Sequence, residues 1–407
     1  MKARLIFLLC LLISHFNYAQ NCDYTKEKFG FRSVKKIFVG TELDFQGNID
    51  SLFLDIYYPV GSTEKLRPLV MWSFGGGFIA GKREDFAPIC EAVAKRGFVA
   101  ATIDYRIGFN GIQILPSDSA EVLRAGFRGI QDGKSALRYL KSRHVMDSID
   151  LDRVWVGGGS AGAIVALGTA FYDKEEIKPK EAGSISAVNG QPRPDLGSIE
   201  GNRFMNNGYD TKVQGVFNIF GAVLNISVFD KSDNIAVFSY HQTEDPVVPC
   251  ERRRAYWAYP IVTDYYPIAY GSCEIEKTLN DLNFNPAYHK AWIYKGNQHA
   301  VHNERDVVNF LINNANPILC NTVNVNDVVS DLKNAYVYPN PVTSEIFIEG
   351  INSLISYSIF NLQGNNIINS VIAPGQKLNV RELESGLYIL QIRDNLETKN
   401  IKFTKLD

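Results

Sequence analysis

Ser160 lies in the most informative stretch of the chain, VWVGGGSAGA, at the centre of a Gly-x-Ser-x-Gly pattern with Gly158 and Gly162. The apolar residues before the pattern predict a strand, and the small residues after it begin a helical stretch. A serine on such a tight strand-to-helix turn takes strained backbone angles, so its neighbours must be small. The turn raises the hydroxyl above the sheet edge and points the helix N-terminus at a developing oxyanion. This context favours a nucleophilic serine over an ordinary tight turn.

A second glycine-rich stretch, WSFGGGFIAG at residues 72–81, follows an earlier strand-like run. Acyl transfer needs backbone N–H donors near a carbonyl oxygen that becomes an anion, and successive glycines let the main chain approach a substrate closely. A phosphate-binding loop would need a lysine and a hydroxyl residue after its glycines, or a fuller dinucleotide fingerprint, and neither occurs. The stretch is therefore a candidate oxyanion loop that precedes the nucleophile.

Ser160 needs a base, and the chain has six histidines. His299 follows the last core strand at its carboxyl end, and we take it as the base. His302, which we place at the start of the next helix, is held in reserve. Hydrolases with this serine turn place the acid after the serine and the histidine after the acid. This order and the positions of the strands argue against the other four, which are His15, His144, His241 and His289.

The acid is expected on a loop after the preceding core strand, for which we take residues 236–240, AVFSY. Asp245 lies on that loop, and Pro246 holds it in an extended conformation. Its carboxylate can therefore accept the second imidazole N–H and fix the tautomer of the base. Glu244 is the local competitor, but its side chain should point elsewhere, as a solvated loop charge does. The predicted triad is Ser160, His299 and Asp245.

The elements that must position these residues form an alternating series from about residue 34 to 315. Several apolar runs continue over successive residues, as expected for strands covered on both faces. Strands that alternate with helices predict an α/β fold with a mostly parallel central sheet and helices on both faces, with function at the carboxyl ends of the strands. The strands are expected at residues 52–58, 69–74, 99–104, 154–157, 215–220, 236–240 and 291–294, and helices at residues 88–96 and 126–143.

Together these motifs resemble the carboxylesterases and the esterase/lipase families of the α/β-hydrolase superfamily. The resemblance extends over most of residues 34–315 and includes IDYR at residues 103–106 and QDGKSALRYL at residues 131–140. It implies the α/β-hydrolase fold and a serine hydrolase that cleaves carboxylic esters without a cofactor. Phe74 stands where many relatives have histidine, so the subfamily stays open.

The resemblance also assigns roles to residues around the triad. It implies that the backbone N–H groups of Gly76, Gly77 and Ala161 form the oxyanion hole. Residues 104–106 would brace the site without taking part in the chemistry.

The sequence pattern changes after Cys320, where the alternation of strand and helix patterns ends. Residues 321–334 read as an asparagine-rich linker, and residues 335–407 show short alternating segments that predict a small β-sandwich. This segment resembles the C-terminal sorting domain of type IX secretion in Bacteroidota, which implies the secretion machinery as a partner. An accessory carbohydrate-binding sandwich is the alternative. The resemblance rests on YPNP at 338–341, FNLQG at 360–364, SGLY at 385–388 and KFTK at 402–405.

The first residues predict a signal peptide at 1–19, because Lys2 and Arg4 precede a short apolar run and Ala19 suits the cleavage site. The catalytic domain would then occupy residues 20–320. No later segment is long and apolar enough to cross a membrane. We therefore expect a secreted or surface-attached protein with no transmembrane segment in the mature chain.

Charge and cysteine content bear on binding to nucleic acid, on metal sites and on disulfides. The 407 residues carry a net charge of −2, which gives no electrostatic case for nucleic acid. No Cys or His cluster has the spacing of a metal site. Export permits disulfides, and Cys250 with Cys273 is the preferred pair, whereas Cys90 in a helical pattern suggests core packing.

Two other functions compete with the esterase. A peptidase of the prolyl-oligopeptidase type shares the fold and the triad, and a non-catalytic adhesion module can keep a hydrolase scaffold. The substrate is expected to be an environmental ester, either small or borne on a polymer: a polysaccharide acetyl or feruloyl ester, a short-chain lipid or a polyester. Residues 181–213 and 256–285 interrupt the core pattern and are candidates for the pocket rim.

Overall fold

The computed structural model describes residues 22–173, 178–201, 207–321, 332, 335–351, 355–393 and 398–407. The predicted signal peptide and most of the predicted linker lie outside these residues. The chain divides into two compact units, Met1–Thr322 and Val323–Asp407, and each is described by itself.

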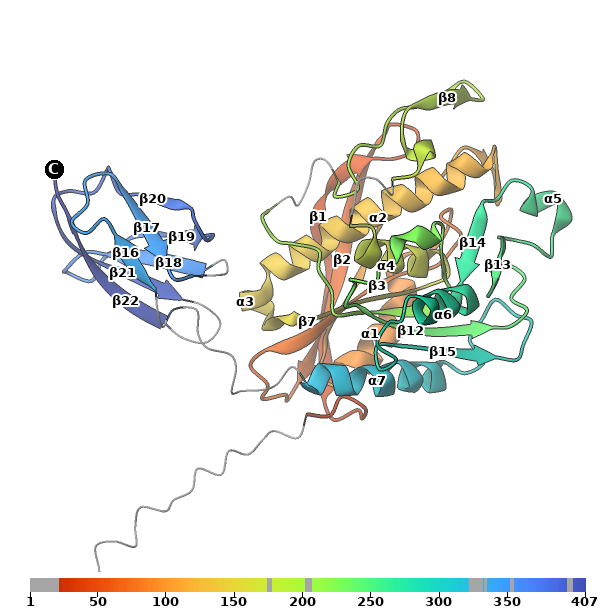
Figure 1. Ribbon diagram of the computed structural model, residues 1–407, viewed down its shortest axis with the longest axis horizontal. Helices are drawn as coiled ribbons and strands as arrows, with labels where there is room; N and C mark the ends of the chain where they lie inside the picture. The colour runs from red at the N-terminus through yellow and green to blue at the C-terminus, as the bar shows by residue number, and fades with distance from the viewer. Residues whose placement is uncertain are drawn as a thin grey trace, which may run out of the picture. The chain divides into compact units, whose positions relative to one another are not determined.

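An eight-stranded sheet forms the centre of the first unit (Figure 1). The first three strands of the sheet pair antiparallel, and the other five neighbouring pairs are all parallel. In spatial order the strands are β1 (Gly30–Leu43), β2 (Ile49–Val60), β4 (Val99–Ile103), β3 (Arg67–Ser73), β7 (Ile149–Gly159), β10 (Gly215–Ile219), β12 (Ala236–Gln242) and β15 (His289–Tyr294). All seven predicted strands belong to this sheet, and the predicted α/β class is confirmed. Strand β1 was largely missed because most of its side chains are exposed and it contains no continuous apolar run.

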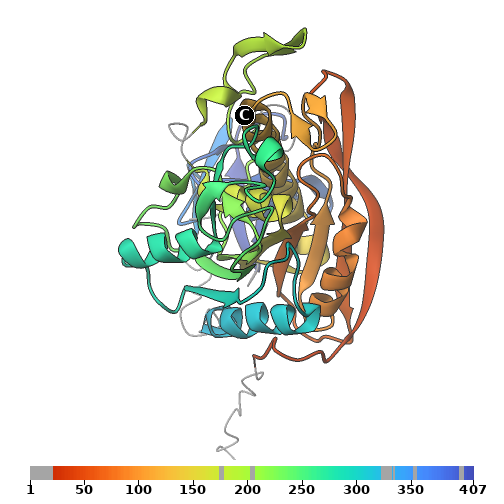
Figure 2. The same ribbon diagram turned by 90° about the vertical axis from the view of Figure 1, so that its right-hand side faces the viewer.

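Helices cover both faces of the sheet, as the two views show (Figures 1 and 2). One face carries α2 (Ser119–Ser142), α4 (Ala161–Phe171) and α6 (Ser272–Asp281), and the other carries α1 (Ala87–Ala94) and α7 (Glu304–Asn321). Two short helices are α3 (His144–Asp147) and α5 (Pro260–Thr263). Each face has its own apolar cluster.

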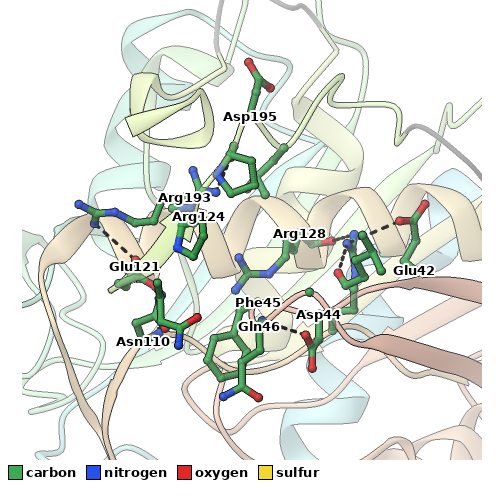
Figure 3. A pocket seen from close by; sticks show the side chains of 17 residues that line it. Glu42, Asp44, Phe45, Gln46, Asn110, Glu121, Arg124, Arg128, Arg193 and Asp195 are labelled. Carbon is green, nitrogen blue, oxygen red and sulfur yellow. Dashed lines mark hydrogen bonds and ion pairs between the residues drawn. The ribbon is translucent and has the colours of Figure 1, made fainter. Parts of the chain in front are cut away.

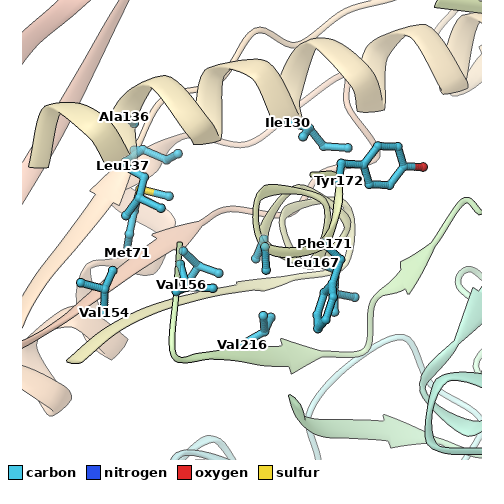
Figure 4. Close-up of a cluster of buried hydrophobic side chains, with 14 of the residues drawn as sticks. Met71, Ile130, Ala136, Leu137, Val154, Val156, Leu167, Phe171, Tyr172 and Val216 are labelled. Atoms are coloured by element: carbon cyan, nitrogen blue, oxygen red, sulfur yellow. The ribbon is translucent and has the colours of Figure 1, made fainter. Parts of the chain in front are cut away.

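The long helix α2 and the nucleophile helix α4 pack together over the centre of the sheet (Figure 4). Ile130 and Leu137 of α2 and Leu167 of α4 are buried against Val156 of β7. Helix α2 begins seven residues earlier than predicted, because the Asp118 side chain accepts the N–H of Glu121 and caps its first turn. Burial of these side chains holds the strand end and the helix start that flank Ser160.

Smaller elements complete the first unit. A second sheet contains β11 (Ala222–Val223), β14 (Ile268–Gly271) and β13 (Arg252–Arg254), and two hairpins pair β5 (Gly111–Ile112) with β6 (Leu115–Pro116) and β8 (Ile185–Val188) with β9 (Gln191–Arg193). The 3-10 turns span Arg83–Phe86, Lys180–Ala182 and Ile226–Val228.

Two disulfides tie the first unit together. Cys250 pairs with Cys273, as predicted, and Cys90 is a free thiol buried in the core. Cys22 pairs with Cys320, a bridge across 298 positions that local sequence pattern did not reveal. No helix among the described residues is long and apolar enough to span a membrane.

The second unit consists of two antiparallel sheets with one apolar cluster of their own. One sheet has the order β16 (Tyr336–Tyr338), β17 (Glu345–Glu349), β20 (Lys377–Asn379). The other has the order β19 (Asn366–Ile372), β18 (Ile355–Phe360), β21 (Gly386–Arg393), β22 (Thr398–Lys405). Buried side chains alternate with exposed ones along β17 and β21, which is the pattern that predicted an all-β unit.

Candidate active site

Ser160 occupies the sharp turn between β7 and α4, with φ of 54° and ψ of −123°. Its backbone N–H donates to the carbonyl of Ile219 on the neighbouring strand at 3.0 Å. A side chain on Gly158 would collide with the backbone of Gly162, and one on Gly162 would collide with the backbone of Ser73. The small residues of the motif are therefore needed because three backbone segments meet at this turn.

His299 lies between the serine and the carboxylate of Asp245. Its Nε2 is 2.7 Å from the Ser160 hydroxyl oxygen, and its Nδ1 is 2.7 Å from Asp245 Oδ2. The serine is 8% exposed and the aspartate fully buried, whereas the histidine side chain is 21% exposed. The structure thus brings the three predicted residues, which are 139 and 54 positions apart in the chain, into one hydrogen-bonded line.

Asp245 is held by its own loop and by a second histidine. Its Oδ1 accepts the N–H groups of Val247 and Val248 at 2.9 and 3.1 Å. Burial raises the pKa of Asp245, but hydrogen bonds from His241 and His299 and their charges outweigh that effect and leave the pKa below its ordinary value. The carboxylate is therefore set up to stay ionised beside the imidazole.

His241 is a neighbour of Asp245 that the sequence reasoning set aside. It is fully buried, and its Nε2 lies 3.5 Å from Asp245 Oδ2 and 2.9 Å from the carbonyl of Val248. Its Nδ1 is 2.8 Å from the hydroxyl of Ser272. The sequence signal that could have identified His241 is its position at the end of β12, four residues before the acid.

The reserve candidates lie apart from this line. His302 stacks on Tyr294 and contacts the hydroxyl of Tyr240, and it precedes α7, which begins at Glu304. The expectation that His302 begins the helix is therefore wrong, because Asn303 provides the side-chain cap. The rival acid, Glu244, is exposed.

The other two described histidines, His144 and His289, contact Lys141 and Glu276 instead.

The glycine loop that contains two of the predicted oxyanion residues passes beside Ser160. A side chain on Gly75 would lie 3.3 Å from the Ser160 Cβ, so the glycine loop runs directly past the nucleophile. Gly76 and Gly77 have φ values of 126° and 62°, which L side chains adopt only under strain. Ala161 is the first residue of α4.

Residues after β4 brace the loop and the helix. The Tyr105 hydroxyl donates to the carbonyl of Phe74 at 2.8 Å, and the two rings stack with centroids 4.4 Å apart. Arg106 makes a buried ion pair with Asp132 of α2 at 2.7 Å. Asp104 pairs with Arg83 at 2.9 Å. None of these side chains contacts the triad directly.

Comparison with known proteins finds two family matches along the chain. Residues 54–256 match the family BD-FAE, and residues 336–405 match the secretion system C-terminal sorting domain. The predicted membership of the α/β-hydrolase superfamily and the predicted sorting domain are both confirmed.

Curated relatives match only part of the hydrolase domain. The neuroligin-like protein glit-1 of Caenorhabditis elegans is 31% identical over 36% of this chain and 19% of its own length. Carboxylesterase 3 of Pongo abelii is 32% identical over 32% of this chain and 22% of its own length. Fumonisin B1 esterase of Sphingopyxis macrogoltabida is 32% identical over 28% of this chain and 22% of its own length. The chain therefore spans about a fifth of the length of these relatives.

Among solved structures, a thermophilic esterase of Thermogutta terrifontis with bound propionate is 17% identical. The match covers 70% of this chain and 94% of that one, with a TM-score of 0.44.

A small apolar cavity of about 40 Å³ opens beside Ser160 in the hydrolase domain. Its walls include Ile164 of α4, Leu224, Tyr256 and Tyr266. The predicted rim segment 256–285 does supply part of this wall. The other predicted rim segment, 181–213, does not contribute a described residue to it, because the segment packs on the far side of α2.

A larger cavity of about 500 Å³ lies between α1 and α7 in the hydrolase domain, and neither Ser160 nor His299 lines it. Phe220 lines it and places its ring edge-on against the His299 ring, with centroids 4.8 Å apart. Phe86 and Ile89 add apolar surface. Its rim carries charged side chains, namely Glu27, Asp85, Arg96, Glu304 and Arg305. Among the residues that the structure describes, no group of three or more His, Cys, Asp or Glu side chains could hold a metal ion.

Proposed function

We propose that this protein hydrolyses carboxylic esters with Ser160 as nucleophile, His299 as base and Asp245 as the orienting acid. The observation that carries the proposal is the unbroken line of two 2.7 Å hydrogen bonds from the hydroxyl to the buried carboxylate. A serine hydroxyl is a weak nucleophile until an oriented base takes its proton. The line supplies such a base.

The reaction proceeds in two halves. Ser160 attacks the ester carbonyl while His299 Nε2 accepts its proton, and the same proton passes to the departing alcohol. Water then attacks the acyl-enzyme with His299 again as base, which releases the acid and restores the serine. Asp245 stabilises the imidazolium that forms in each half and keeps its own negative charge.

The oxyanion of each tetrahedral intermediate is stabilised by backbone N–H groups. Gly76 and Gly77 come from the loop after β3, and Ala161 comes from the first turn of α4, where the helix dipole adds its field. Loss of one such donor typically raises the barrier by ~3 kcal/mol.

The cavity beside Ser160 favours a short acyl group. A cavity needs about 15 Å³ to hold one water-sized group, so this cavity accommodates roughly three such groups, which suits an acetyl or propionyl chain. Together with export through the sorting domain, this supports an environmental ester such as an acetylated polysaccharide.

Ser160→Ala tests the proposal directly. We expect a folded protein with almost no turnover of p-nitrophenyl acetate, because the residual effect of the oxyanion hole and binding alone is small. The matched control is Ser232→Ala, which removes an exposed serine hydroxyl and should leave turnover unchanged. Substantial turnover by the Ser160→Ala protein would refute the assignment.

A fluorophosphonate probe separates the alternatives. Labelling that is lost in Ser160→Ala and kept in Ser232→Ala supports an activated serine, and absence of labelling in the unchanged protein would favour the adhesion module. Amide turnover that exceeds ester turnover would favour the peptidase.

A further inference from the structure

A third cavity, of about 270 Å³, lies beside α2, and Ser160 does not line it (Figure 3). It is enclosed by the β1–β2 turn at residues 42–47, the first half of α2 and the segment 191–196. Arg128 of α2 extends into it toward Phe45. We call it the Arg128 cavity.

Arg128 is 2% exposed, and no carboxylate in the described parts of the chain forms an ion pair with it. One Nη donates to the carbonyl of Gly108 at 2.6 Å, whereas the buried Nε has no hydrogen-bond partner among the described residues. Burial, together with the charges of Arg106 and Arg124, lowers the pKa of Arg128 to about 9. A buried guanidinium without a counter-charge is energetically unfavourable, so an anion at this position would be strongly stabilised.

Arg124, one turn before Arg128 on α2, adds a second cation that makes no ion pair with a described residue. Its three hydrogen bonds all end on backbone carbonyls, those of Glu181, Gly183 and Pro194. Carbonyl dipoles satisfy the N–H groups but leave the net charge in place. Two positive charges therefore face the cavity from one helix.

The other two arginines of the cavity are neutralised. Arg106 makes a two-pronged ion pair with the buried Asp132. Arg193 pairs with Asp118 at 2.8 Å and with Glu121 at 3.4 Å. These pairs hold the walls, and they leave Arg124 and Arg128 of α2 without an ion pair among the described residues.

The remaining acidic side chains of the wall already have partners. Glu42 lies 4.0 Å from Arg106, and Asp195 lies 2.6 Å from Lys178. Asp44 accepts two N–H groups of its own turn. Asp44 is thus a wall carboxylate without an ion pair among the described residues, and it forms none with Arg128.

We propose that the Arg128 cavity binds the carboxylate of a small hydroxylated acid about the size of one sugar ring, such as a hexuronate. A planar guanidinium matches a carboxylate in shape and charge. The volume lies just below the usual range for small-molecule sites, which suits a single ring. The Phe45 ring and the amides of Gln46 and Gln191 complete a wall that suits a hydroxylated ring.

This cavity is separate from the serine site but connected to it through the backbone. The carbonyl of Gly108 accepts from Arg128, and the Gly108 N–H donates to the carbonyl of Phe78, which directly follows the glycine loop. Val122, on the opposite side of the same helix, lines the small cavity beside Ser160.

Titration calorimetry of the full chain with sodium glucuronate, at constant ionic strength, tests the site. We expect saturable binding that glucose, the neutral ring, does not show. The same titration on Ser160→Ala protein should give the same affinity, so the outcome is independent of the proposed esterase. Failure of millimolar glucuronate to bind would overturn the proposal. Binding of inorganic phosphate in preference to glucuronate would overturn the organic ligand and leave a simple anion site.

Substitutions locate the binding. Arg128→Gln should weaken glucuronate by roughly ten- to a hundredfold, because a charge-assisted hydrogen bond is lost. Gln46 is exposed at the rim and offers a matched pair that does not threaten folding. Gln46→Glu should weaken binding by about two- to fivefold, and Gln46→Lys should strengthen it by a similar factor. Unchanged affinity across this pair would place the ligand elsewhere and overturn the proposal.

Discussion

Asp245 shows how a single side chain is tuned by its surroundings. Burial opposes its negative charge, yet two loop N–H groups and two histidines hold that charge in place. His241 approaches the same Oδ2 that His299 uses, so the acid is contacted from both sides. An arrangement of this kind keeps the carboxylate fixed in position for the imidazole.

The lowered pKa of Asp245 has a consequence for acid stability. A carboxyl whose folded pKa lies below its unfolded value of 3.8 contributes stability above that value and loses it as the pH falls through the folded pKa. We expect Asp245→Asn to be less stable than the unchanged protein near neutral pH and to lose stability less steeply between about pH 5 and 3. Urea unfolding at a series of pH values measures both slopes. Parallel curves for the two proteins would contradict the expectation.

At the scale of elements, helix α4 and the residues around β14 line the small cavity that we propose holds the acyl group. Ile164 comes from α4, whereas Tyr266 precedes β14 and Leu224 follows β11. The small cavity therefore depends on the packing of a second, three-stranded sheet against the main unit. Its size is a property of that contact and of no single motif.

Leu224→Ala should enlarge this cavity at modest cost, because Leu224 is only partly buried. We expect the ratio of kcat/KM for p-nitrophenyl butyrate to that for the acetate to rise roughly tenfold, since each methylene group in an apolar pocket contributes about that factor. The control is Ile89→Ala in the larger cavity, which contacts neither acyl chain and should leave the ratio unchanged. An unchanged ratio in Leu224→Ala would show that the acyl chain lies elsewhere.

At the scale of the whole molecule, the first unit is closed by a covalent bond between its ends. Cys22 precedes β1 and Cys320 lies in the last turn of α7, so the bridge encloses the entire hydrolase domain. The second unit has its own apolar cluster, drawn only from residues after position 331. Each unit therefore has a core that could be built without the other.

Removal of the long bridge should destabilise the hydrolase domain markedly. We expect the Cys22→Ser, Cys320→Ser double variant to lower the free energy of unfolding by about 2–5 kcal/mol, because the unfolded chain regains the freedom of a very long loop. Equilibrium unfolding in urea measures the change. A loss smaller than that of the Cys250→Ser, Cys273→Ser double variant, which opens a loop of only 23 positions, would contradict the loop-entropy argument.

Local patterns in the sequence were sufficient for the elements and for the residue types of the candidate site. Continuous apolar runs identified seven strands of the sheet, and small residues around Ser160 marked the strained turn, because both signals arise from neighbours in the chain. Strand β1 was not predicted, because an exposed edge strand needs no continuous apolar run.

Contacts between distant segments were decided only by the tertiary structure. The approach of His241 to Asp245, the pairing of Cys22 with Cys320 and the uncompensated charge of Arg128 all depend on which surfaces pack together. Residue types and their spacing determine which secondary structure a segment can form. Contacts between residues that are far apart in the chain depend on burial and shape in three dimensions. For this protein, short motifs predicted the candidate catalytic residues, whereas the cavities beside them could not be predicted because distant segments form their walls.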